Sequence, residues 1–119
     1  MLIDVRTQPE WQFVGAPDLS GLAKSVVFRS WQDYPSMQIA PDFVDGLATE
    51  LQSRGAKETS ALLFLCRSGA RSRAAAIAVT AAGFRRCFNI ADGFEGPLDG
   101  RKRRGVKGWK ARGLPWGQT

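Results

Sequence analysis

The feature that most constrains the fold is an unbroken apolar run at residues 61–66, which ends in a cysteine, Cys66. A run with apolar residues on both faces is typical of a strand buried inside a parallel sheet. A short polar loop follows, and an alanine-rich stretch at residues 72–82 predicts a helix that Gly83 can end in a left-handed conformation. The sequence therefore predicts a central strand, a short loop and a helix.

The rest of the chain alternates short apolar runs with helical patterns. Three more strands are predicted, at residues 2–5, 25–28 and 87–90. Phe43, Leu47 and Leu51 lie four residues apart on one face of a helix predicted from about residue 41 to Gly55. This alternation over about 100 residues favours an α/β domain with a mainly parallel sheet.

The connecting segments are predicted from their turn-forming residues. Residues 7–21 predict a loop, residues 98–105 an exposed excursion and residues 106–112 a short helical turn. No repeat or low-complexity linker divides the chain, so residues 1–119 are expected to form a single domain that includes the basic segment 101–119.

The chain contains no histidine. This excludes Ser-His and Cys-His nucleophiles, histidine metal ligands and imidazole proton shuttles. The two cysteines are too few for a disulfide-rich scaffold or a four-ligand zinc site, so neither a metal nor another cofactor is expected. The amino terminus lacks an export signal, and no apolar run approaches the roughly 18 residues of a membrane span. We therefore expect a soluble cytoplasmic protein.

Cys66 stands where a parallel sheet is expected to bind its ligand, beyond the carboxyl end of a buried strand. Backbone N–H groups of the following loop and the positive end of the next helix would form a cradle for an anion. The same field lowers a thiol pKa, and a drop of two units from ~8.5 raises the thiolate fraction at pH 7 from ~3% to ~75%. Such a thiolate attacks a sulfane sulfur without a general base.

Four ordered blocks of the sequence resemble the rhodanese, or thiosulfate sulfurtransferase, homology domains. The blocks are residues 2–7 with Glu10 and Trp11, residues 64–72, residues 83–84 with 89–90 and 92–96, and residues 108–110 with 113–116. They run from residue 2 to residue 116, so the resemblance covers nearly the whole chain.

The resemblance implies a three-layer α/β/α domain around a central, mainly parallel sheet. Family members usually open with a helix and a short edge strand before the block that matches residues 2–7, and this chain starts at that block. We therefore expect four to five strands here, with the amino-terminal helix and edge strand missing. Either the sequence is truncated at its start, or a partner chain covers the surface left exposed.

The resemblance also implies the site and the reaction. Cys66 matches the cysteine that accepts sulfur from thiosulfate or a persulfide donor and passes it to a thiophilic acceptor. The loop residues that would bind the substrate are Arg67, Ser68, Gly69, Ala70 and Arg71. Their backbone N–H groups would hold the persulfide or the anionic end of the donor, and the Arg67 and Arg71 side chains would attract that donor.

The length of the loop between the cysteine and the arginine separates rhodanese domains from the phosphatases that are related to them. Related phosphatases and arsenate reductases use Cys-x5-Arg, whereas Cys66 and Arg71 form Cys-x4-Arg. The residue before the cysteine, often His in a phosphatase, is Leu65. A sulfurtransferase is therefore favoured over a phosphatase, and a non-catalytic module that recognises a protein or a sulfur carrier is the alternative.

The formal charge of +6 is local rather than general. Residues 1–100 hold ten basic and eleven acidic residues, whereas residues 101–119 hold seven basic residues and no acidic one. A solubilising surface loop is the favoured interpretation of residues 101–112, ahead of a nucleic-acid patch. The loop could also draw thiosulfate or an acidic protein partner toward Cys66. No membrane partner is expected.

Several other residues receive more modest predictions. Cys87 begins its strand whereas Cys66 ends another, so we expect it not to resolve a Cys66 persulfide. Asp4 and Arg6 are predicted to be structural, pairing with each other or with backbone. Trp31, with Tyr34, is assigned either to a wall of the pocket or to the core, and Phe94 and Glu95, which follow the final strand, are placed where they could contact an acceptor. Trp109 and Trp116 are expected to pin the carboxy-terminal segment.

Overall fold

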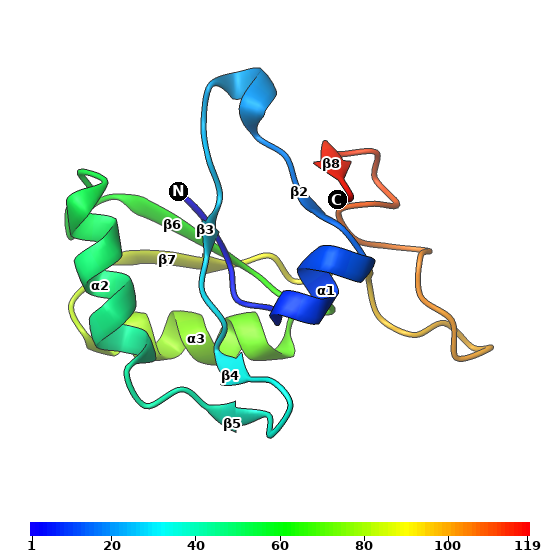
Figure 1. Cartoon of the computed structure of the whole chain (residues 1–119), viewed down its shortest axis with the longest axis horizontal. Coiled ribbons are helices and arrows are strands. Elements are labelled where there is room, and N and C mark those ends of the chain that lie inside the picture. Colours follow the sequence, from blue (N-terminus) through cyan, green and yellow to red (C-terminus); the bar gives the residue numbers. More distant parts are fainter.

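The computed structural model describes all 119 residues and has a four-stranded parallel sheet at its centre (Figure 1). The strands are β1 (Leu2–Asp4), β3 (Val27–Phe28), β6 (Ala61–Leu65) and β7 (Arg86–Asn89), in the order β3-β1-β6-β7. All four predicted strands are present, and the apolar run at residues 61–66 lies inside the sheet rather than at its edge. The sheet has the lower of the two strand numbers expected.

Two helices cover one face of the sheet, α2 (Phe43–Ser53) and α3 (Ala70–Ala81). The apolar face predicted for α2 is fully buried, since Phe43, Leu47 and Leu51 are at most 1% exposed. α3 starts two residues earlier than predicted, and Gly83 follows it with a φ of 111° in the left-handed region. The main core of 14 buried residues lies between these helices and the sheet.

The opposite face of the sheet is covered mainly near the carboxyl ends of its strands. The short helix α1 (Gln8–Phe13) lies there, with Trp11 packed edge-on against Phe28 at 5.1 Å between ring centroids. A second core cluster joins Leu2, Val26, Leu65 and Phe94. The layers are therefore α/β/α, as predicted. Leu63 and Phe88 remain 40% and 47% exposed toward the amino half of this face.

The prediction of a loop throughout residues 7–21 was wrong. This segment contains α1, the strand β2 (Ala16–Pro17) and a 3-10 turn at Ser20–Leu22. Thr7 caps α1 in a capping box with Glu10, and Pro9 occupies the first turn, where its missing N–H costs nothing. A helix of six residues is too short to show an apolar period, so only these capping residues could reveal it.

The remaining strands form two small antiparallel pairs. β2 pairs with β8 (Trp116–Gly117), which ties the carboxy-terminal segment to the chain that follows α1. β4 (Gln32–Asp33) and β5 (Gln38–Ile39) form a hairpin beyond the sheet. The helical turn predicted at residues 106–112 is confirmed in part: residues 106–108 are bends, and residues 109–113 form a hydrogen-bonded turn in which the Arg112 N–H donates to the Gly108 carbonyl at 3.0 Å. None of the helices has the length and apolar character needed to cross a membrane.

Candidate active site

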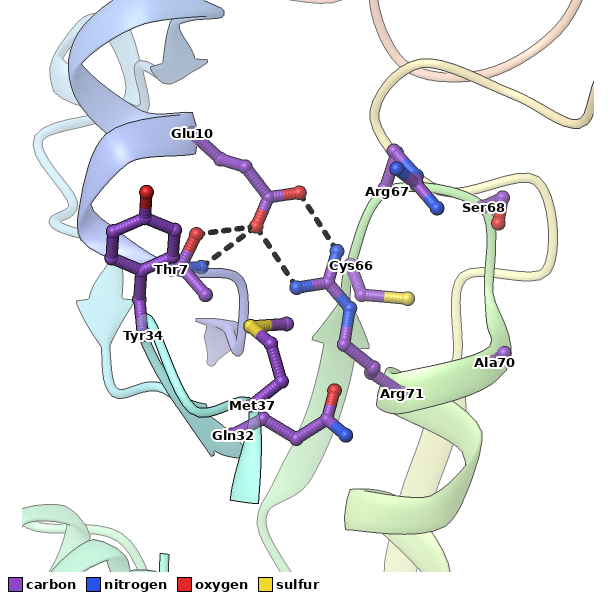
Figure 2. A pocket seen from close by; sticks show the side chains of 10 residues that line it. All are labelled: Thr7, Glu10, Gln32, Tyr34, Met37, Cys66, Arg67, Ser68, Ala70 and Arg71. Carbon is purple, nitrogen blue, oxygen red and sulfur yellow. Dashed lines mark hydrogen bonds and ion pairs between the residues drawn. The ribbon is translucent and has the colours of Figure 1, made fainter. Parts of the chain in front are cut away.

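Cys66 directly follows β6 and lies at the floor of a cavity of about 380 Å³ (Figure 2). Its side chain is buried, with only 1% of the residue exposed. The loop turns at Gly69 and enters α3 at Ala70, so the start of the helix lies directly beyond the sulfur. The predicted order of buried strand, cysteine loop and helix is confirmed.

Hydrogen-bond donors surround the Cys66 sulfur. The Gly69 N–H donates to Sγ at 3.1 Å, and the Ser72 hydroxyl lies 3.2 Å from Sγ. Burial raises the pKa of the Cys66 thiol. The Ser72 hydroxyl and the backbone N–H groups of Ser72, Gly69 and Ser68 together lower this pKa by more than burial raises it. The net pKa lies below the ordinary value. The loop therefore favours a thiolate, as its sequence suggested.

Behind the sulfur, Ser72 and Asn89 form a second layer of contacts. The Ser72 hydroxyl has one proton and three acceptors in reach, because it also lies 3.2 Å from the Gly69 carbonyl and 2.5 Å from Asn89 Oδ1. Asn89 Nδ2 in turn donates to the Gly69 carbonyl at 3.1 Å. Ser72 can therefore donate to Cys66 when the sulfur is a thiolate and to Asn89 when it is not.

Arg71 points across the cavity to Glu10 of α1. Its two terminal nitrogens donate to the two carboxylate oxygens at 2.9 and 2.8 Å, which is a bidentate pair. The two side chains are only 16% and 18% exposed. Burial raises the pKa of Glu10, but hydrogen bonds from Arg71 and Thr7 lower it to about 2. The Arg71 charge is thus balanced inside the site.

The predicted loop residues differ in what they present to the cavity. Arg67 is exposed at the mouth and forms no ion pair. Ser68 and Ala70 line the cavity, whereas Gly69 is buried and meets Sγ through its N–H. Arg71 lines the cavity while paired with Glu10. Cys66 and all five predicted loop residues therefore lie together around one cavity, four of the five at its lining.

The wall opposite the loop comes from the β4–β5 hairpin. Gln32, Tyr34 and Met37 line the cavity on that side (Figure 2). Trp31 packs edge-on against Phe43 at 5.0 Å, so it belongs to the core, whereas Tyr34 belongs to the pocket. The sequence alone did not separate these two roles, because both residues lie in one loop after β3.

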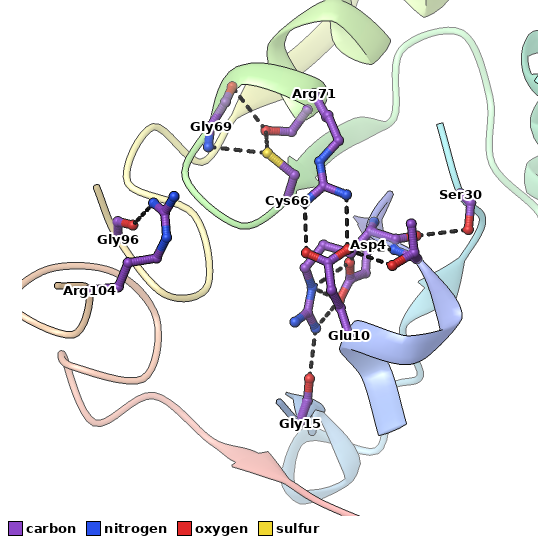
Figure 3. A network of polar contacts seen from close by, with 12 residues as sticks. Asp4, Glu10, Gly15, Ser30, Cys66, Gly69, Arg71, Gly96 and Arg104 are labelled. Carbon is purple, nitrogen blue, oxygen red and sulfur yellow. Dashed lines mark hydrogen bonds and ion pairs between the residues drawn. The ribbon is translucent and has the colours of Figure 1, made fainter. Parts of the chain in front are cut away.

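A buried ion pair supports the site from below (Figure 3). Arg6 and Asp4 are fully buried and pair at 2.7 Å, which confirms their structural role. Arg6 also donates to the Gly15 carbonyl at 2.8 Å, and its guanidinium lies 4.2 Å from the centroid of the Phe94 ring. Phe94 is fully buried and is therefore a core residue. Arg6 thus joins the end of β1 to the chain that follows α1 and to the loop after β7.

Two glycines allow the Cys66 loop to pack closely on the loop after β7. Gly69 has a φ of 111°, and a Cβ there would collide with the Ala91 carbonyl oxygen. Gly93 has a φ of 68°, and its Cβ would collide with the Arg67 carbonyl oxygen. The Phe94 N–H also donates to the Cys66 carbonyl at 2.8 Å. Backbone contacts on both sides therefore hold the loop.

Cys87 lies away from the cavity. It pairs in register with Leu62, which is four residues before Cys66 on the adjacent strand. At about 3.3 Å per residue the two cysteines are separated by about 13 Å, beyond the reach of a disulfide. Both cysteines are free.

Glu10, Ser72 and Asn89 lie within the blocks that resemble the family, but the sequence predicted no role for them at the site. Each carried a usable signal. Glu10 follows Thr7 at the spacing of a capping box, and Ser72 directly follows the Cys-x4-Arg loop. Asn89 ends the strand beside β6, so it reaches the same edge of the sheet as Cys66.

Known proteins that match this chain are similar over most of its length. A family model described as the STR4 middle domain matches residues 1–119. Uncharacterized protein RC0915 of Rickettsia conorii is 43% identical over 115 residues, which are 97% of this chain and 80% of that protein. Rhodanese-like domain-containing protein 4, chloroplastic, of Arabidopsis thaliana is 28% identical over 97% of this chain and 21% of that protein.

A solved structure, that of Rv0390 from M. tuberculosis, has the same fold. It superposes with a TM-score of 0.84 at 44% sequence identity and covers 100% of this chain and 84% of that one. The Arabidopsis match is a distant similarity to a rhodanese-like domain protein and agrees with the α/β/α layers. On the match that spans the full chain, the protein belongs to the STR4 middle domain family.

Proposed function

We propose that this protein is a sulfurtransferase that moves a sulfane sulfur through a persulfide on Cys66. The observation that carries the proposal is the position of the Cys66 sulfur, at the floor of a cavity and surrounded by N–H and O–H donors that lower its pKa. No histidine or other base is needed, because the attacking group is already a thiolate.

The reaction runs in two balanced steps. The Cys66 thiolate attacks the outer sulfur of a donor such as thiosulfate, so a bond from Sγ to that sulfur forms and the donor S–S bond breaks. Sulfite leaves with the electron pair of the broken bond, and the outer sulfur of the persulfide carries the negative charge. A thiophilic acceptor, such as cyanide or a thiolate, then attacks that sulfur and releases the Cys66 thiolate.

The same donors serve both states of the sulfur. The Gly69 N–H and the Ser72 hydroxyl face Sγ, and the amino-terminal end of α3 adds a positive field. Arg67, exposed at the mouth and without an ion pair, is the side chain that meets an anionic donor. Arg71 acts mainly through its pair with Glu10, which keeps the site from accumulating two free positive charges.

The proposal is tested by incubating the reduced protein with thiosulfate and measuring its intact mass, followed by peptide mapping. We expect a mass increase of one sulfur atom at Cys66, release of sulfite, and thiocyanate on addition of cyanide. Cys87→Ala should behave as the parent protein, whereas Cys66→Ser should form neither adduct nor thiocyanate. An unmodified Cys66 would refute the proposal and leave the alternative, a non-catalytic module that recognises a protein or a sulfur carrier.

We further propose that the reaction takes place in the cytoplasm, where a reducing environment would keep the Cys66 thiol available for attack.

A further inference from the structure

A basic loop lies beside the Cys66 site and has no role in the reaction proposed above. We call residues 96–108 the basic excursion; it carries five basic residues and one acidic residue, Asp99. In Figure 1 it projects from the carboxyl edge of the sheet, past α1. The excursion holds five of the seven basic residues that follow residue 100, whereas the charges of residues 1–100 nearly balance.

The excursion is a folded loop, with contacts at its base and hydrogen bonds at its tip. At its base, a Cβ on Gly96 would collide with the Lys107 carbonyl oxygen, and a Cβ on Gly108 would lie 2.7 Å from the Gly96 nitrogen, so the two ends of the excursion touch. At its tip, Asp99 Oδ1 accepts hydrogen bonds from the N–H groups of Arg101 and Arg103 at 2.8 and 2.9 Å. The side chains at the tip are therefore displayed on a folded turn.

The positive charges of the excursion are unpaired. Arg101, Lys102, Arg103 and Lys107 are exposed, and none of the five ion pairs in the structure includes them. Arg104 donates to the Gly96 carbonyl at 2.8 Å rather than to a carboxylate. The Asp99 carboxylate accepts hydrogen bonds from backbone N–H groups of the turn and forms no ion pair with these side chains. The field of the excursion is consequently directed toward solvent.

Two hydrogen bonds connect the excursion to the active-site loop. The Gly105 N–H donates to the Glu95 carbonyl at 3.0 Å, and the Glu95 N–H donates to the Arg67 carbonyl at 3.0 Å. Figure 3 shows Arg104 and Gly96 on the side of the Cys66 loop away from Glu10. The excursion is thus joined through Glu95 to the backbone of Arg67, which lines the cavity, while the excursion itself lies outside the cavity lining.

The aromatic residues nearby favour a protein over a nucleic acid as the partner. Base stacking needs free aromatic faces among the basic residues. The Trp109 Nε1 group donates to the Pro115 carbonyl at 2.8 Å, and the Lys110 ammonium lies over the Trp116 ring at 3.9 Å. Both tryptophans are therefore used in holding the carboxy-terminal segment, as predicted from the sequence.

We infer that the basic excursion is a docking surface for an acidic protein partner that exchanges sulfur with Cys66, an inference that rests on the proposed function. In the donor direction, the partner's cysteine persulfide presents its outer sulfur to the Cys66 thiolate. A bond from Sγ to that sulfur forms, the S–S bond of the partner breaks, and the partner's thiolate leaves with the electron pair. The excursion speeds the encounter of the two proteins by attracting the acidic partner, and Cys66 carries out the sulfur transfer.

The test uses two synthetic peptides of equal length, each with one cysteine persulfide, flanked by glutamates in one peptide and by glutamines in the other. The second-order rate of sulfur transfer to Cys66 is measured by rapid quenching and mass spectrometry. We expect the acidic peptide to react about tenfold faster at low ionic strength and to lose this advantage near 0.5 M salt, where screening is strong.

The decisive variant carries Arg101→Gln, Lys102→Gln and Arg103→Gln, because these exposed side chains take no part in folding the turn. It should abolish the preference for the acidic peptide and leave the rate of the neutral peptide unchanged. The matched control removes three exposed charges at the amino end of the sheet, with Lys57→Gln, Arg85→Gln and Arg86→Gln, and should retain the preference.

The outcomes separate the two proposals. Equal rates for both peptides, with thiosulfate still modifying Cys66, would overturn the docking surface and leave the sulfurtransferase intact. Failure of all donors to modify Cys66 would overturn both. If the triple variant loses salt-sensitive affinity for a single-stranded RNA and keeps its peptide preference, the surface belongs to nucleic acid and the inference is wrong.

Discussion

Replacing Glu10 with glutamine removes the carboxylate that faces Arg71 and keeps an amide oxygen that can still accept from Thr7 in the capping box. The pKa of Glu10 falls from 4.5 to about 2 on folding. At about 1.4 kcal/mol per pKa unit, this difference corresponds to about 3 kcal/mol. Since the two side chains are more than four-fifths buried, little of this free energy is lost to solvent screening.

The pH dependence gives the prediction its sign. The pKa of Glu10 is lower in the folded protein, so its contribution to stability is complete above about pH 4.5 and is lost as the pH falls toward 2. We expect Glu10→Gln to lower the free energy of unfolding by about 3 kcal/mol at pH 7, and the difference between variant and parent to shrink steadily below pH 4.5. Urea unfolding of both proteins from pH 7 to pH 3 measures it.

Glu50→Gln is the matched control. Glu50 pairs with Arg54 at 2.9 Å and Arg29 at 3.5 Å on the surface, where the side chains are 26–35% exposed, and such pairs contribute about 1 kcal/mol or less. A Glu10→Gln effect no larger than that of Glu50→Gln, or one that stays constant between pH 7 and pH 3, would refute the reasoning.

The same variant tests the charge balance of the cavity. Without Glu10, the Arg71 guanidinium keeps its full charge beside Cys66, so a dianionic donor gains attraction that the parent protein cancels. We expect the KM for thiosulfate to fall and this gain to disappear at high salt. A KM that rises at every ionic strength would show that the ion pair positions the loop for the donor rather than balancing its charge.

Three further variants probe the site. Ser72→Ala removes the hydroxyl that lowers the pKa of Cys66, so the pH profile of alkylation by iodoacetamide should move to higher pH, and an unmoved profile would exclude a role for this hydroxyl. Gly69→Ala should destabilise the protein by clearly more than Gly83→Ala; both glycines have a φ of 111°, but only Gly69 meets a carbonyl, and equal losses in urea unfolding would refute the close approach. Asp4→Asn leaves Arg6 buried without a counter-charge and should cost about 3–5 kcal/mol of unfolding free energy by the same measurement; a loss below about 1 kcal/mol would contradict this role.

The central part of the fold could be predicted because its signals are local and strong. An apolar run on both faces, a polar loop with one glycine and an alanine-rich helix all lie within about 20 residues, and β6, Cys66 and α3 follow them. The α2 helix was equally clear, because its three core residues repeat every four positions and a glycine follows its end. A helix that buries one face shows a regular spacing of apolar residues, and this spacing can be recognised in the sequence.

The balance of charge at the site could not be predicted in the same way. Arg71 and Glu10 are 61 residues apart in the chain, and each taken alone suggests a free charged group. Their pairing depends on how α1 sits over the carboxyl end of the sheet, and α1 shows itself only in its capping residues. The contact of Ser72 with Asn89 is equally non-local, since it requires β6 and β7 to be neighbours.

The β4–β5 hairpin that walls the cavity is closed at its base, where the Ala40 N–H donates to the Trp31 carbonyl at 2.9 Å. Its lining residues make none of the hydrogen bonds that hold the Cys66 sulfur. If the chain transfers sulfur as proposed, the contacts that hold the sulfur and the wall that faces an acceptor belong to separable parts of the chain. We therefore expect insertions between Trp31 and Ala40 to change the choice of acceptor and to leave the pKa of Cys66 unchanged, which makes this hairpin the segment to exchange when engineering new acceptors.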